Sequence, residues 1–295
     1  MVRVTYPPGR LLSLLLALAL LCAPFRAARA EETTLTDLPP EEEPRTAPAA
    51  GAELEVWFPT IQDADCTLIL CGGKAVMIDC GTREDYGTIR DLMRRAGVKR
   101  LDLMIVTHPH HDHLGSLRSM LRKGLIKEIV AFHRRGDGDK TSLLWHDPET
   151  YGVPVHLRKS GDTIVVGSIV LEAYVASRPM KDMNARSAVL KLTYGESTML
   201  FLSDIDPPTM LRLLRARGAA WLKADVLRAA HHGKRAMPDR FVQAVDPDYI
   251  VITAHKSADE GKLQAAQLRA KVLYTTRKTI RMTTDGSRWK VQRSE

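Results

Sequence analysis

The chain has 295 residues, of which 44% are hydrophobic, and its 43 Lys and Arg against 35 Asp and Glu give a formal net charge of +8. Four of the arginines lie in the first 30 residues, so a chain without that segment would carry a net charge of +4. Such a charge permits a phosphate-bearing substrate but does not demand one, because it serves solubility equally well. The cysteines lack zinc-finger spacing and no internal repeat is present, which argues against zinc-finger and solenoid classes.

Residues 1–30 have the pattern of a secretory signal. Arg3 and Arg10 precede an apolar run over residues 11–21, and Ala28-Arg29-Ala30 has the small-x-small form of a cleavage site. About eleven apolar residues are too few for a stable membrane-spanning helix. We therefore predict cleavage after Ala30, export to the periplasm or out of the cell, and no stable membrane span afterwards. An uncleaved anchor and lipidation of Cys22 are less favoured alternatives.

Residues 31–52 are acidic and rich in Pro, Thr and Ala. Such a composition buries too little apolar surface to offset the entropy of ordering, so we predict a disordered linker. The remaining residues, 53–295, are enough for one α/β domain with a sizeable core.

The domain begins with a strand at 54–58 and a hairpin at 66–79, whose turn is Gly72-Gly73. A helix at 86–96 and a strand at 101–106 follow. Cys66 and Cys71 lie five apart, hence on opposite faces of one strand. Cys80 would point to the other face from Cys66 in a hairpin with a two-residue turn, so we predict buried and mostly free thiols.

The later segments are mostly strands. We predict an irregular connection at 133–151, which would form either a substrate-facing loop or a plain surface loop. His133, His146 and His156 are isolated histidines with a weak case as ligands. The other predicted elements are helices at 117–125, 208–217, 238–245 and 262–270, and strands at 126–132, 163–166, 168–175, 187–193, 197–202, 224–230, 249–253, 272–276 and 279–284.

The strand at 101–106 leads directly into a histidine-rich loop, Thr107-His108-Pro109-His110-His111-Asp112-His113. Imidazole and carboxylate are the usual ligands of zinc and its first-row neighbours, and an open coordination position lowers the pKa of a bound water. His108 and His110 could face one metal, and Asp112 and His113 a second. The alternative is a solvated polar loop that happens to be rich in histidine.

Two later strands also end in candidate ligands. Asp204 follows one of them and is our candidate bridging ligand, although it could instead cap the next helix, a role that suits Asp206 better. His231-His232-Gly233 follows the other strand. We predict that one of these histidines, with His231 favoured, completes the shell of the second metal. The neighbouring imidazole or Lys234-Arg235 could act on the substrate, or the two bases could simply be exposed.

The order of these motifs resembles the metallo-β-lactamase superfamily, and within it the chain is most similar to the hydrolase domain of ComEC-type competence proteins and its stand-alone relatives. Ile78-Asp79-Cys80-Gly81 and Asn184-Ala185-Arg186-Ser187 are similar to further motifs of that group. The resemblance implies a four-layer αββα sandwich with a metal site at one edge of the two sheets. The large membrane channel of those relatives is missing here, so DNA transport by this chain alone is not implied.

The resemblance also implies roles for individual residues. His108, His110 and Asp204 would hold one metal, and Asp112, His113, Asp204 and His231 the other, with one or two Zn²⁺ per chain or Mn²⁺ in their place. A metal-bound hydroxide would be the nucleophile, Asp112 would be catalytic by orienting it, and Asp79 would support the ligand loop. The chain departs from the family pattern at Asn184, where many members have histidine, at Ser203, where glycine is usual, and at Lys234, where serine is usual.

The leading hypothesis is an exported metal-dependent hydrolase that acts on a phosphodiester, either an anionic small molecule or nucleic acid. Hydrolysis of a lactam, lactone or other ester is the alternative within the superfamily, because the fold does not select among these reactions. A non-catalytic, metal-containing envelope binding module is the third hypothesis. The presence of Asp112, which a purely structural site would not need, argues against it.

Overall fold

The computed structural model describes residues 52–138, 141–176, 182–254 and 270–293. The predicted signal at 1–30, almost all of the linker, and the helix at 262–270 apart from its last residue lie outside these described residues. Within them, no helix is both long and apolar enough to cross a membrane.

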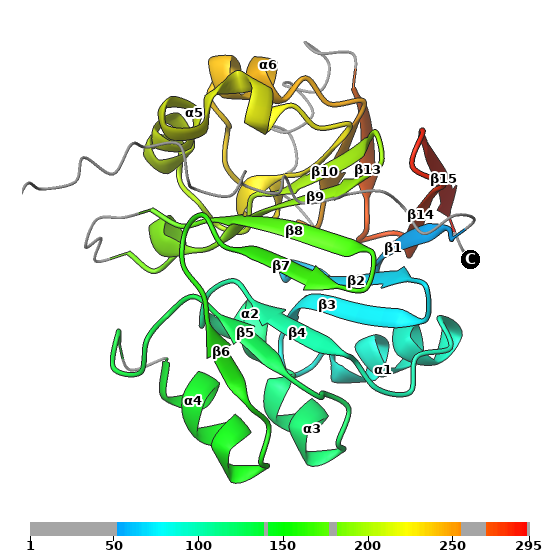
Figure 1. The fold of residues 1–295 in the computed structure, drawn as a ribbon, viewed down its shortest axis with the longest axis vertical. Coiled ribbons are helices and arrows are strands. Elements are labelled where there is room, and N and C mark those ends of the chain that lie inside the picture. The colour runs from blue at the N-terminus through cyan, green and yellow to red at the C-terminus, as the bar shows by residue number, and fades with distance from the viewer. Residues whose placement is uncertain (1–51, 139–140, 177–181, 255–269, 294–295) are drawn as a thin grey trace, which may run out of the picture. The chain divides into compact units, whose positions relative to one another are not determined.

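Two β-sheets form the centre of the domain (Figure 1). One has eight strands in the order β15-β14-β1-β2-β3-β4-β5-β6, and the other has seven in the order β13-β12-β11-β10-β9-β8-β7. The strands of the first sheet are β1 Leu54–Phe58, β2 Cys66–Cys71, β3 Lys74–Cys80, β4 Leu103–Val106, β5 Ile129–Ala131, β6 Val155–Leu157, β14 Ile280–Thr284 and β15 Trp289–Arg293. Those of the second are β7 Thr163–Val166, β8 Ile169–Tyr174, β9 Val189–Tyr194, β10 Ser197–Phe201, β11 Val226–Arg228, β12 Tyr249–Ile252 and β13 Lys271–Tyr274.

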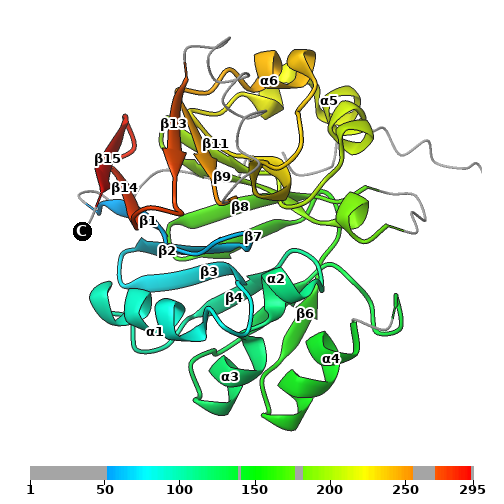
Figure 2. The same ribbon diagram turned by 180° about the vertical axis from the view of Figure 1, so that it is seen from behind.

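Helices cover the outer face of each sheet (Figures 1 and 2). On the first sheet lie α1 Tyr86–Arg95, α3 Leu117–Arg122 and α4 Thr141–Thr150, and on the second lie α5 Pro207–Leu222 and α6 Asp239–Val245. The very short helix α2 His111–Leu114 and the 3-10 turns η1 Asn184–Arg186 and η2 Ala230–Gly233 lie in the connections. The layers are therefore helix, sheet, sheet, helix, which confirms the predicted αββα sandwich.

Strand β4 illustrates why its sequence suits this position. Leu103 and Ile105 face the core between the two sheets, whereas Met104 and Val106 face the helices, and all four side chains are buried. A strand that is covered on both faces has no polar face, so its sequence is a continuous run of apolar residues. The predicted strand at 101–106 has this character, although Leu101 makes only an isolated bridge with Ile126.

The hairpin of β2 and β3 forms with the predicted turn. Gly72 and Gly73 take φ values of 55° and 75°, the positive values that a tight two-residue turn requires. A bulge between Cys66 and Thr67 places Cys66 opposite Cys80, so both thiols face the same core, contrary to our prediction that they point to opposite faces. The prediction of free, buried cysteines is confirmed for Cys66, Cys71 and Cys80.

The predicted irregular connection at 133–151 is wrong over its second half, where α4 forms. Pro148, which lacks a backbone N–H, lies inside this helix. Strands β6 and β15 were also not predicted, because each is short and only partly apolar. Helix α5 is interrupted at Gly218, whose φ of 75° and ψ of 167° are not helical, so its first part agrees with the predicted helix at 208–217. Asp206 caps it by accepting a hydrogen bond from Thr209 N at 2.9 Å, as predicted.

Candidate metal centre

The histidine-rich loop after β4 meets the ends of β10 and β11 at the junction of the two sheets. Hydrogen bonds join these segments: Ser203 Oγ, after β10, donates to Thr107 Oγ1 at 2.8 Å, and His231 N, after β11, donates to Ser203 O at 2.8 Å. The parallel strands β3 and β4, and likewise β10 and β11, end at common edges of their sheets. This arrangement brings residues more than 90 positions apart in the sequence into one polar site, which is a common place for active sites in α/β proteins.

The first group of candidate ligands consists of His108, His110 and Asp204. His108 Nε2 lies 3.0 Å from His110 Nδ1 and 3.8 Å from Asp204 Oδ2. On the other side of the His108 ring, Nδ1 lies 3.2 Å from the Thr107 hydroxyl, so a hydrogen on Nδ1 can be donated there. His108 Nε2 is then left without a hydrogen, as a metal ligand must be.

The second group includes His113 and the same aspartate. His113 Nδ1 donates to Asp79 Oδ2 at 2.7 Å, and its Nε2 lies 3.2 Å from Asp204 Oδ1. Asp79 also accepts hydrogen bonds from the backbone N–H and the hydroxyl of Thr107, at 2.8 Å and 2.7 Å. Asp79 therefore fixes the orientation of the His113 ring, the support that the family resemblance implied for it.

Asp204 lies between the two groups. Its Oδ1 faces His113 and its Oδ2 faces His108, and the carboxylate is almost completely buried. Both His113 Nε2 and Asp204 Oδ1 are buried without a hydrogen-bond partner among the described residues. Two electron-rich atoms facing each other in a buried site need a cation between them. The donor set of imidazoles and carboxylates fits a first-row divalent metal, and the shared Asp204 fits a pair of metals.

His232, and not His231, belongs to the second group of candidate ligands. His232 is fully buried, and its Nε2 lies 3.2 Å from Asp112 Oδ2. His231 is partly exposed, belongs to neither group within the described part of the chain, and packs edge-on to His232 at 5.7 Å between ring centroids. The geometry therefore differs from our preference for His231. Both His231 and His232 adopt positive φ, at 50° and 63°, a backbone conformation that is rare for residues other than glycine.

Asp65 is a member of this site that our sequence reasoning missed. Its Oδ1 lies 3.2 Å from His232 Nδ1 and pairs with the buried guanidinium of Arg228, which also donates to Thr253 Oγ1 at 2.9 Å. Asp65 stands to His232 as Asp79 stands to His113, because each carboxylate can hold the outer ring nitrogen of a ligand histidine. A signal for it existed in the sequence: Arg228 is a charged residue inside an apolar strand, and such a residue needs a buried partner.

The charges of the site favour cation binding. Burial lowers the pKa of His108 and of His232, so both imidazoles are held in the neutral, ligand-competent form. Burial opposes ionisation of Asp112, but the neighbouring His232, whose Nε2 lies 3.2 Å away, outweighs it and holds the pKa of this carboxyl below its usual range. Burial also disfavours a charge on His113, yet Asp204 and Asp79 raise the pKa of His113 above its ordinary value of 6.5. The carboxylates around His113 thus favour positive charge at the place where a metal would bind.

Other residues singled out from the sequence lie around this centre. Asn184 Oδ1 and both ring nitrogens of His133 are buried without hydrogen-bond partners among the described residues. His133 is electrostatically close to His110, and burial lowers the pKa of His133 to about 4. Lys234 pairs with Asp63 at 2.8 Å, so it is less available to a substrate than its position after the histidines implies.

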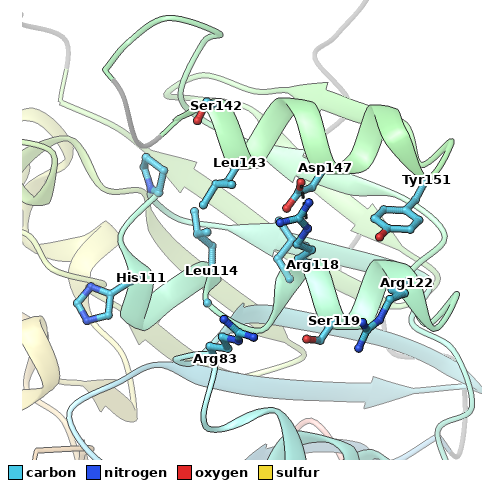
Figure 3. Close-up of a pocket in the computed structure, with 13 residues that line it drawn as sticks. Arg83, His111, Leu114, Arg118, Ser119, Arg122, Ser142, Leu143, Asp147 and Tyr151 are labelled. Atoms are coloured by element: carbon cyan, nitrogen blue, oxygen red, sulfur yellow. Dashed lines mark ion pairs between the residues drawn. The ribbon is translucent and has the colours of Figure 1, made fainter.

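A groove of about 790 Å³ lies beside the metal loop (Figure 3). Pro109, His111 and Leu114 of that loop line it, but none of the candidate ligands does. Figure 3 shows it running between α3, which carries Arg118 and Arg122, and α4. The groove is therefore adjacent to the metal centre and separate from it.

Comparison with known proteins agrees with this site. The model of the metallo-beta-lactamase superfamily matches residues 60–255. The chain belongs to the metallo-beta-lactamase superfamily. This membership confirms the prediction of a metal-dependent hydrolase. The two groups of candidate ligands have room for two metals, whose identity they do not specify.

The curated relatives include competence proteins, which confirms the predicted likeness to that group. The chain is 27% identical over 165 residues to ComE operon protein 3 of Bacillus subtilis, which covers 55% of this chain and 21% of that protein. It is 24% identical over 237 residues to competence protein ComA of Neisseria gonorrhoeae, which covers 77% of this chain and 31% of that protein. It is also 27% identical over 128 residues to YobT of Bacillus subtilis, with 41% and 53% covered. The chain thus spans between about a fifth and a half of the length of these relatives.

Solved structures show the same fold. The metallo-beta-lactamase fold protein YhfI from Bacillus subtilis has a TM-score of 0.54 at 13% identity, covering 76% of this chain and 95% of that one. CmlA, a diiron beta-hydroxylase from Streptomyces venezuelae, has a TM-score of 0.53 at 15% identity, covering 78% and 54%. At such low identity these matches show the fold alone.

Proposed function

We propose that this protein is an exported, metal-dependent phosphodiesterase that acts on nucleic acid, with zinc or manganese held by the two groups of ligands. The observation that carries the proposal is Asp204, whose two oxygens face one imidazole nitrogen from each group. Export is proposed from the signal pattern of residues 1–30, with residues 31–52 as a linker and 53–295 as the hydrolase domain.

His108, His110 and Asp204 would hold one metal, and His113, Asp204 and His232 the other. When bound, the metals would supply Lewis-acid chemistry, lowering the pKa of water and stabilising negative charge on the substrate. Asp112 lies beside His232, is ionised at neutral pH, and can accept a hydrogen bond from the attacking water, so it would orient the nucleophile. Asp79 and Asp65 would keep His113 and His232 in position.

The choice of a phosphodiester is supported by the relatives. One of them is named competence protein ComA, and its similarity covers 77% of this chain; the similarity to ComE operon protein 3 covers 55%. A phosphodiester also suits a site with two metals, because both the attacking and the leaving oxygen can be stabilised. Hydrolysis of a lactam, lactone or other ester uses the same groups and is the outcome to test against.

The test is cleavage of labelled single-stranded DNA by the purified protein with Zn²⁺ or Mn²⁺ added. We expect metal-dependent cleavage, with a rate reduced at least about 100-fold in Asp112→Ala, the usual effect of losing a positioned acid–base group. His156→Ala is the matched control, because His156 is exposed and pairs with Glu128 outside the site. Absence of DNA cleavage, together with turnover of a β-lactam or a p-nitrophenyl ester that Asp112→Ala removes, would replace the phosphodiesterase proposal with the alternative.

A further inference from the structure

The groove between α3 and α4 carries an excess of positive charge. Three arginines line it, Arg83, Arg118 and Arg122, against a single carboxylate, Asp147. Arg118 lies 3.6 Å from Asp147, which is buried at the side of the groove, while the Arg118 side chain is 70% exposed. Arg83 and Arg122 have no ion-pair partner among the described residues. Two guanidinium groups are thus available to an anion.

The wall opposite α3 exposes large apolar side chains. Leu143 and Tyr151 of the α4 side are 47% and 38% exposed, and they are two of the four large hydrophobic side chains that the described residues expose. In Figure 3, Leu143 faces the metal-loop end of the groove, and Tyr151 lies at its far end, across from Arg122. The groove therefore combines one basic wall with one wall of exposed apolar and aromatic surface.

The position of Arg83 is fixed by the metal loop. Gly115 follows that loop, and a Cβ there would lie 2.5 Å from Arg83 N and 2.4 Å from His111 O. Gly115 N also donates to Gly81 O at 2.8 Å, and Ser116 Oγ donates to Thr82 O at 2.6 Å. The backbone that carries Arg83 is therefore packed directly against the helix that carries Asp112.

His111 connects the groove with the catalytic carboxylate. It lines the groove, its side chain is 83% exposed, and its Nδ1 lies 3.7 Å from Asp112 Oδ1. A ligand that lies along the groove would thus reach the edge of the metal centre at this end.

We propose that this groove binds one strand of single-stranded nucleic acid next to the metal centre. Its phosphates would contact Arg83, Arg118 and Arg122, and its bases would lie against Leu143 and Tyr151. This combination of basic groups and stacking surface is how proteins hold single strands without reading their sequence. Arg118 and Arg122 lie one helical turn apart on α3, so they can contact two phosphates of one strand. The choice of ligand rests on the proposed phosphodiesterase function.

Binding is measured without metal, so that it is independent of cleavage. The probe is a fluorescein-labelled 12-nucleotide oligo(dT), followed by fluorescence anisotropy in EDTA over a series of salt concentrations. The test variant is Arg83→Ala/Arg122→Ala, because neither arginine supports the fold through an ion pair. The matched control is Arg90→Ala/Lys99→Ala, which removes the same charge from exposed positions outside the groove.

We expect Kd to rise about tenfold in the groove variant, and the slope of log K against log salt to become shallower by about 1.4, or 0.7 per lost contact. The control should stay within about twofold of the unchanged protein. Equal affinity in the groove variant, or an equal loss in the control, would overturn the proposal. The proposal would also be overturned if the protein did not bind the oligonucleotide but bound anionic phospholipid vesicles in a way that depends on these arginines.

The two proposals fail separately. Groove-dependent oligonucleotide binding without any DNA cleavage would leave the groove assignment in place and remove the phosphodiesterase proposal. DNA cleavage together with an unchanged Kd in Arg83→Ala/Arg122→Ala would leave the phosphodiesterase proposal in place and remove the groove assignment.

Discussion

Replacement of His232 tests which of two adjacent histidines completes the metal centre. If His232 is the ligand, His232→Ala should lower the affinity of the second metal by more than about 100-fold, since loss of a supporting group alone typically costs 10–100-fold. His231→Ala should lower it by less than about tenfold, because His231 belongs to neither ligand group among the described residues. The adjacent variants thus serve as controls for each other.

The structure also sets the expected effect of His232→Ala on stability. The ring is fully buried, and its removal leaves a void and deprives Asp112 and Asp65 of contacts at 3.2 Å. A void of this kind with lost hydrogen bonds costs about 2–4 kcal/mol, within the 5–15 kcal/mol by which a typical domain is stable. The variant should therefore fold, with a lower Tm, and His232→Gln should recover part of the loss by filling the space.

Metal binding is followed by titrating each metal-free protein with Co²⁺, whose visible absorption reports coordination, and by measuring metal content after dialysis. Circular dichroism at each step shows that the protein remains folded. Our reasoning would be refuted by a folded His232→Ala that keeps both metals while His231→Ala loses one. The sequence-based choice of His231 would then be the right one.

Three other predictions can be checked independently. Asp204→Asn keeps the shape of the side chain but removes the negative charge that both ligand groups share. The metal content of the variant should therefore be less than half that of the unchanged protein, and its rate of DNA cleavage should be lower by a factor of at least about 1000. Burial raises the pKa of the Cys66 and Cys80 thiols above 9.0. Both thiols should therefore stay protonated, and iodoacetamide should not label them, as the pH rises from 7 to 9. Labelling as fast as in the unfolded chain, measured by mass spectrometry, would contradict this. Gly115→Ala should lower the free energy of unfolding in urea by about 2–4 kcal/mol, because the added Cβ would lie 2.4 Å from His111 O. An unchanged midpoint of unfolding would show that the loop shifts to accommodate the Cβ without a cost in stability.

The histidines of the metal loop could be named from the sequence because their signal is local, whereas Asp112, which we also predicted to be a metal ligand, belongs to neither ligand group among the described residues. His108, His110, Asp112 and His113 lie within six residues directly after an apolar strand, so their proximity does not depend on the rest of the fold. Asp204 was found by the same rule, a carboxylate at the end of a strand. The layer order followed from the family resemblance, and the alternation of buried residues along β4 agrees with it.

Residues whose role depends on tertiary neighbours could not be predicted in this way. Asp65 has no motif around it, and its role comes from His232 and Arg228, more than 160 positions later. The choice between His231 and His232 depends on two left-handed backbone conformations, which residues other than glycine rarely adopt. Such strain is common at functional sites and is invisible in the sequence pattern.

Ser203 illustrates how a departure from the family pattern is accommodated. Its φ is 47°, a conformation that favours glycine, the residue usual at this position in the competence-type group. The serine hydroxyl, however, donates to Thr107 Oγ1 at 2.8 Å, and Thr107 in turn donates to Asp79. This chain of hydrogen bonds joins the end of β10 in one sheet to the ends of β3 and β4 in the other, so the strained residue links the two halves of the site.

The two groups of candidate metal ligands are not equivalent. His113 and His232 each have a carboxylate within 3.2 Å of the outer ring nitrogen, and such a partner raises the basicity of a ligand and fixes its orientation. His108 has only hydroxyl groups there, at 3.2 Å and 3.4 Å. The first position also has Asn184 in the region where many relatives have a further histidine. The better-supported second position should therefore bind metal more tightly, and Asp204, shared by both, would make the first depend on the second.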